Sequence, residues 1–139
     1  MTHRRIVNLC GLLAIISLAG CSGGDGVVPV AGIVTLDGTP LIEATVAFDP
    51  VRGGSGTVYV ATTDTSGEYA LKDLDGSAGA PPGSYRISIS TAKPLSPGPV
   101  NEDTKFSPER VPAKYLSGQL TFDVPPGGTE SANFDLSSR

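Results

Sequence analysis

The imidazole and thiol side chains of this 139-residue sequence all lie within its first 21 residues. Its single histidine is His3, its two cysteines are Cys10 and Cys21, and it has no tryptophan. A chain that loses its first 20 residues therefore keeps one thiol and no imidazole. Serine and cysteine nucleophiles are typically activated by an imidazole, and structural zinc sites are built from Cys and His. We therefore expect no catalysis, no metal site and no cofactor in residues 21–139, apart from a covalent lipid discussed below.

Residues 1–20 have the pattern of an export signal. Arg4 and Arg5 form a basic start, and a mostly apolar run follows from Ile6 to Ala19. A helix that crosses a bilayer needs about 20 apolar residues, which is more than this run offers. We predict a cleaved signal peptide over residues 1–20. The alternatives are an uncleaved N-terminal anchor and a cleaved signal in which Cys21 is incidental.

The predicted signal ends in Leu18-Ala19-Gly20-Cys21, which resembles the lipobox of bacterial lipoproteins. The resemblance implies cleavage between Gly20 and Cys21 and acylation of the Cys21 thiol. One myristoyl chain binds a membrane only marginally, whereas two or three chains hold a protein there stably. We expect an exported protein that is lipid-anchored to the bacterial cell envelope. Ser22 is not the aspartate that retains some lipoproteins on the inner membrane, so the outer membrane is favoured.

The rest of the sequence predicts one domain behind a short tether. Residues 21–29 comprise the lipidated cysteine and a Gly/Ser-rich tether, and residues 30–139 form the domain. Loss of Arg4 and Arg5 makes this part more acidic than the whole chain, whose net charge is −4. Nucleic-acid affinity depends on Lys and Arg that neutralise phosphates, so nucleic acid is excluded as a partner. The expected partners are the membrane and an envelope protein or polysaccharide.

The domain shows the two-residue alternation of β-strands and no helical period. The clearest case places Tyr85, Ile87 and Ile89 on one face of a strand. Glycine and proline separate the alternating segments, as Asp37-Gly38 does after the first of them. We predict an all-β fold, a seven-stranded antiparallel β-sandwich. Its strands are expected over residues 30–36, 44–49, 57–64, 68–72, 85–90, 119–124 and 130–136.

Several turn motifs resemble those of carboxypeptidase regulatory-like domains, which are seven-stranded, transthyretin-like β-sandwiches. The resemblance covers about residues 30–137. It implies an accessory, non-catalytic role, and enzymes on related sandwiches use histidines that residues 21–139 lack. The motifs are TLDGTPLIEATVAF at 35–48, TDTSGEY at 63–69, PGSYRI at 82–87 and VPAKY at 111–115.

Residues 93–114 break the alternation and are the best candidate contact surface. They contain five prolines and charges of both signs. A loop this long in a compact domain is usually either functional or disordered. We expect Phe106 and Tyr115 to attach parts of it to the sandwich. The candidate contact residues are Lys93, Lys105, Phe106, Arg110 and Lys114.

Two acids near a glycine, Asp73 and Asp75, raise the possibility of calcium binding. Calcium prefers several oxygen ligands, and the longer ladder of an EF-hand loop is missing here. We interpret these residues, and Asp64 near Gly67, as turn residues whose side chains bond the local backbone.

Sugar binding would need an exposed aromatic ring. Tyr59 is the best candidate if its neighbours Val58 and Val60 face the core. We therefore predict a non-catalytic, lipid-anchored envelope protein that serves as a structural or protein-interaction module. The alternative is a polysaccharide- or small-ligand-binding lipoprotein that assists uptake.

Overall fold

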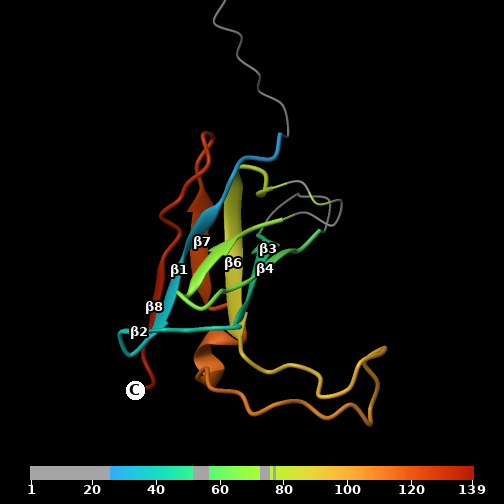
Figure 1. The fold of residues 1–139 in the computed structure, drawn as a ribbon. Helices are drawn as coiled ribbons and strands as arrows, with labels where there is room; N and C mark the ends of the chain where they lie inside the picture. Colours follow the sequence, from blue (N-terminus) through green and yellow to red (C-terminus); the bar gives the residue numbers. More distant parts are fainter. Residues whose placement is uncertain (1–25, 52–56, 73–75, 77) are drawn as a thin grey trace, which may run out of the picture.

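The computed structural model describes residues 26–51, 57–72, 76 and 78–139 and places them in two β-sheets (Figure 1). In the first sheet, β1 pairs with β2, β5 and β8, and the order of the second sheet is β4-β3-β6-β7. The all-β prediction is therefore confirmed for the described residues. The elements are β1 (Ala31–Leu36), β2 (Thr39–Pro40), β3 (Thr45–Pro50), β4 (Tyr59–Thr62), β5 (Glu68–Ala70), β6 (Gly83–Ser90), the 3-10 turn η1 (Ala113–Tyr115), β7 (Leu120–Val124) and β8 (Phe134–Leu136).

The alternation seen in the sequence decides which side chains enter the core. Tyr85, Ile87 and Ile89 of β6 are all buried, with at most 3% of their surface exposed. Successive side chains of a strand point to opposite faces, so Arg86 and Ser88 lie on the other face of β6. The predicted inward face of this strand is confirmed.

Phe48 of β3 lies at the centre of the core and is fully buried. Its ring contacts two rings of each sheet, with centroid distances between 5.8 and 6.3 Å. Tilted and edge-on contacts of this kind are the favoured geometry for aromatic pairs. One aromatic cluster therefore joins the two sheets into a sandwich. The four rings around Phe48 are those of Tyr69, Tyr85, Phe122 and Phe134.

The number of strands differs from the prediction of seven. Each predicted segment overlaps one observed strand, and β2 is an additional one. Asp37 and Gly38 have φ angles of 51° and 79°, as a two-residue hairpin turn requires. This turn brings Pro40 opposite Thr35. Proline is tolerated there because β2 is a short strand at the edge of the sheet.

The last strand corrects the prediction of a purely antiparallel sandwich. β8 pairs with β1 in parallel, with Phe134 opposite Val34. After β7 the chain turns over to the first sheet, where Thr129 forms a parallel bridge with Val30. Between this bridge and β8, four residues (130–133) lie opposite only three residues of β1 (31–33). Residues 130–133 therefore form a bulge, and β8 begins only at Phe134. The predicted strand over 130–136 is therefore shortened at its start.

The two ends of the sandwich have different features (Figure 1). The chain enters the sandwich at the end that also carries the turn between β7 and β8, as Figure 1 shows. The segment between β6 and η1 projects from the opposite end. The predicted signal, Gly20, Cys21 and most of the tether lie outside the described residues. Within the described part of the chain, no helix is long and apolar enough to span a bilayer.

Candidate interaction surfaces

The predicted contact loop contains a hairpin at its centre. Pro94 and Phe106 form an antiparallel bridge. The Leu95 amide donates to the Lys105 carbonyl at 2.8 Å, and the Ser107 amide donates to the carbonyl of residue 93 at 2.8 Å. We call residues 93–107 the distal hairpin, because it projects from the end of the sandwich opposite to the entering chain.

The carboxylate of Glu109 fixes the base of the distal hairpin to the end of β6. It accepts hydrogen bonds from the Thr91 amide at 2.8 Å, the Thr91 hydroxyl at 2.6 Å and the Val111 amide at 2.9 Å. The Ser90 hydroxyl and the Ala92 amide complete the set of donors. Hydrogen bonds to an ionised carboxylate are roughly twice as strong as neutral ones. One side chain therefore holds together the two chain segments at the base of the hairpin, residues 90–92 and 109–111.

These donors also set the ionisation of Glu109. Burial alone would raise the pKa of its carboxyl, but the hydrogen bonds from Ser90, Thr91 and Val111 outweigh burial and lower the pKa to about 2. Donors that bond a carboxylate favour its charged form. Glu109 is consequently ionised at neutral pH, as the geometry of its donors requires.

Three of the five predicted contact residues are used to attach the loop to the sandwich. Arg110 donates from Nη2 to the Ile42 carbonyl at 2.9 Å, and Lys93 lies 3.6 Å from the Glu43 carboxylate. Lys114 donates to the Arg139 carbonyl at 2.6 Å. That these five residues contact a partner stays a prediction. In the described residues, Lys93, Lys105 and Phe106 are the three of the five whose backbone pairing lies within the distal hairpin.

The distal hairpin displays large apolar side chains. Leu95 is 62% exposed, Val100 is 63% exposed and Phe106 is 47% exposed. Phe106 thus does not pack on the sandwich as expected. Sequence reasoning overlooked Leu95 and Val100, although both are isolated apolar residues in a proline-rich segment. These are the three most exposed of the large apolar side chains in the described part of the chain.

Tyr115 does attach the loop to the sandwich, as predicted. Its ring is partly buried against the core, and its hydroxyl accepts a hydrogen bond from the Ser137 amide at 3.1 Å. Lys114 lies over the same ring, with Nζ 4.9 Å from the centroid. The loop therefore returns to the sandwich close to the end of the chain.

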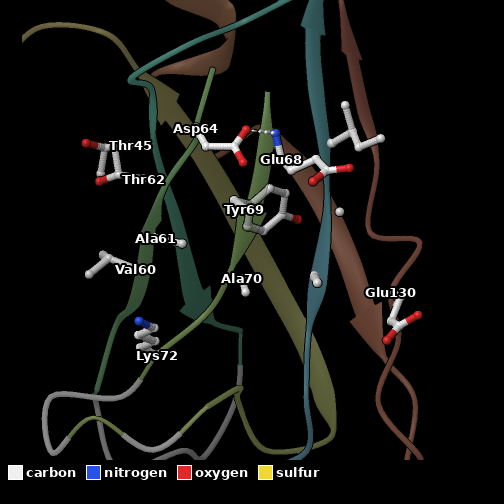
Figure 2. Close-up of a pocket in the computed structure, with 13 residues that line it drawn as sticks. Thr45, Val60, Ala61, Thr62, Asp64, Glu68, Tyr69, Ala70, Lys72 and Glu130 are labelled. Carbon is white, nitrogen blue, oxygen red and sulfur yellow. Dashed lines mark hydrogen bonds between the residues drawn. The ribbon is translucent and has the colours of Figure 1, made fainter. Parts of the chain in front are cut away.

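A second surface feature, a groove of about 870 Å³, lies between β4 and β5 (Figure 2). These strands form a hairpin that passes from one sheet to the other. It is closed at one end by the hydrogen bond from the Asp64 amide to the Glu68 carbonyl, and at the other by the bridge between Val60 and Lys72. The groove opens between these two points.

The acids that line the groove differ in their availability. Asp64 accepts from the amides of Ser66 and Glu68 at 2.8 and 3.0 Å, so its predicted role as a turn residue is confirmed. Glu68 and Glu130 are exposed, and no ion pair of the described residues engages either one. Asp73 and Asp75, the other acids considered for calcium, lie outside the described residues. No group of three His, Cys, Asp or Glu that could hold a metal occurs in the described ranges.

The structure corrects the prediction that Tyr59 is an exposed ring. Tyr59 is only 5% exposed, whereas Val58 and Val60 are each 42% exposed. The face of β4 that points to the core is thus the opposite of the one that sugar binding needed. The Tyr59 ring packs edge-on against the Tyr85 ring, with a centroid distance of 6.1 Å. Among the described aromatic residues, Phe106 is the most exposed.

No protein-family model, curated protein or solved structure significantly matches this chain.

Proposed function

We propose that this protein is a non-catalytic, lipid-anchored module of the bacterial envelope that binds a protein partner through its distal hairpin. The observation that carries the proposal is the exposure of Leu95, Val100 and Phe106 on a hairpin whose base is held by Glu109. An ordered base lowers the entropy that is lost when a loop binds. A hairpin of this kind is suited to recognition rather than to catalysis.

The position of the hairpin fits an anchored protein. The chain enters the sandwich at one end and the hairpin projects from the other (Figure 1). If Cys21 carries the lipid, the sandwich acts as a spacer that holds the hairpin away from the membrane. This arrangement favours a protein partner in the envelope over the bilayer that holds the anchor.

We further propose that the sandwich belongs to the carboxypeptidase regulatory-like type, with a transthyretin-like topology. The two-sheet architecture and the hairpin turn at Asp37-Gly38 support this assignment. The alternative role, binding of a polysaccharide or small ligand, has less support because Tyr59 lies in the core.

Replacement of the acylated cysteine tests the anchor. We expect Cys21→Ser to shift the protein from the membrane fraction to the soluble fraction, because two or more acyl chains are needed for stable attachment. Fractionation and immunoblotting measure the shift. Cys10→Ser, within the predicted signal, is the matched control and should remain with the membrane. A Cys21→Ser protein that stays membrane-bound would show that the anchor is not this lipid.

Truncation of apolar side chains tests the contact surface. We expect Val100→Ser combined with Phe106→Ser to reduce in-cell crosslinking through Lys105 about tenfold, since loss of well-packed interface side chains weakens binding by about 1–2 kcal/mol or more. Stability should change by less than about 0.5 kcal/mol, because both side chains are exposed. Val58→Ser removes a similarly exposed valine outside the hairpin and should leave crosslinking unchanged. Equal crosslinking in all three proteins would contradict the proposal.

A further inference from the structure

We propose that the groove between β4 and β5 binds an extended, basic segment of a polypeptide. This site is separate from the distal hairpin, and the inference does not depend on the function proposed for that hairpin. The groove combines backbone groups, an apolar lining and free carboxylates. The lining indicates alternating apolar side chains in the occupant, and the carboxylates indicate basic ones.

Backbone groups of two strands face the groove. The hairpin of β4 and β5 is joined at both ends, yet within the described residues no bridge connects Thr62 to Ala70 between them. The amide of Leu71 donates to the Val30 carbonyl, and the amide of Thr63 donates to the Ala44 carbonyl. Because antiparallel strands direct alternate residues to opposite edges, the backbone groups of Thr62 and Ala70 face the groove. Because the two strands are joined at both ends, a peptide cannot enter between them as an added strand. It would lie over the groove, where its main-chain groups can bond to those of Thr62 and Ala70.

The lining of the groove favours an occupant with apolar side chains at alternate positions. Ile33 of β1 is 38% exposed and Val60 of β4 is 42% exposed, and both line the groove together with Ala70. These side chains offer apolar surface on both sides of the opening. An extended segment with an apolar residue at every second position would cover them, because its side chains alternate in direction.

The charges along the groove favour basic residues in the occupant. Glu68 and Glu130 lie along the β1 side of the groove, and Lys72 lies beside β4 (Figure 2). Asp64 already bonds two backbone amides. Two free carboxylates against one ammonium group leave the rim negative, so lysine or arginine of an occupant would be attracted and acidic residues repelled.

Titration with a designed peptide tests the site. The protein is purified from membranes in a non-ionic detergent, labelled with ¹⁵N, and titrated with acetyl-Lys-Val-Lys-Val-Lys-Val-amide while amide shifts are recorded. We expect saturable shifts at Ile33, Val60 and Ala70 with a Kd below about 1 mM. The same peptide with Glu in place of Lys should not bind, and spermine, which has charge but no backbone, should bind at least about fivefold more weakly.

Neutral variants separate the site from general charge effects. Glu68→Gln and Glu130→Gln should each weaken peptide binding about two- to fivefold, as expected for exposed ion pairs. Glu102→Gln makes the same charge change on the distal hairpin and should leave the affinity unaltered. Absence of shifts in the groove, equal binding of the acidic peptide or of spermine, or equal weakening by Glu102→Gln would each overturn the proposal. None of these outcomes bears on crosslinking through the distal hairpin, so the two proposals fail separately.

Discussion

Gly32→Ala is expected to destabilise the fold by about 3 kcal/mol or more, the high end for overpacking a core. A Cβ atom on Gly32 would lie 2.0 Å from the carbonyl oxygen of Ala132. That carbonyl cannot easily move, because the Tyr69 hydroxyl donates to it at 2.6 Å and the Ala132 amide donates to the Ala31 carbonyl at 3.0 Å. The substitution must therefore separate the 130–133 bulge from β1 or distort the strand.

Urea denaturation at neutral pH measures this effect. Gly127→Ala is the matched control, because nothing lies within 4 Å of its added Cβ and its φ is not positive. We expect the control to change the free energy of unfolding by less than about 0.5 kcal/mol. A Gly32→Ala protein as stable as the control would show that the bulge does not pass over β1 as described.

Glu109→Gln is expected to lower the free energy of unfolding by about 2 kcal/mol at pH 7, since hydrogen bonds to charged groups contribute about 1.5–3 kcal/mol. The amide keeps the size of the side chain but replaces one of the two accepting oxygens with an NH₂ group. That group cannot accept a hydrogen bond from the Thr91 and Val111 amides, or from the Ala92 amide, whichever side it takes. The pKa of Glu109 is about 2 in the folded protein, below its ordinary value of 4.5. Its stabilisation is therefore complete above about pH 4.5 and is lost as the pH falls toward 2.

Unfolding measured between pH 7 and pH 2 separates Glu109 from the other acids. The unmodified protein should lose stability in this range, and the Glu109→Gln variant should lose less. Some pH dependence should remain, because hydrogen bonding to Ser138 also lowers the pKa of Asp37. Glu102→Gln, on the exposed part of the hairpin, should behave like the unmodified protein. If Glu109→Gln keeps the full acid dependence, Glu109 does not hold the base of the loop.

Local sequence patterns were sufficient to predict most strands and their inward faces. The alternation of Tyr85, Ile87 and Ile89 places these residues in the core because a strand has only two faces. The parallel pairing of β8 could not be predicted in this way. It depends on the contact between Gly32 and Ala132, which are far apart in the sequence, and a glycine in a strand pattern indicates close backbone approach without naming the partner.

The candidate surfaces were predicted only in part. The length and composition of residues 93–114 indicated a functional loop, but they did not show that Lys93, Arg110 and Lys114 serve as attachments. Glu109 was overlooked because one acid in a mixed-charge loop carries no local signal, and its donors come from the end of β6. The groove was missed for the same reason, since its walls belong to strands of different sheets.

The central claim, that the distal hairpin contacts a protein partner, is tested most directly by site-specific photo-crosslinking in cells. One probe replaces Val100 on the hairpin, and a second replaces Thr121, an exposed residue of β7. We predict that the probe at position 100 captures one recurrent envelope protein and that the probe at position 121 does not. Absence of a specific product at position 100, or the same products at both positions, would contradict the proposed function.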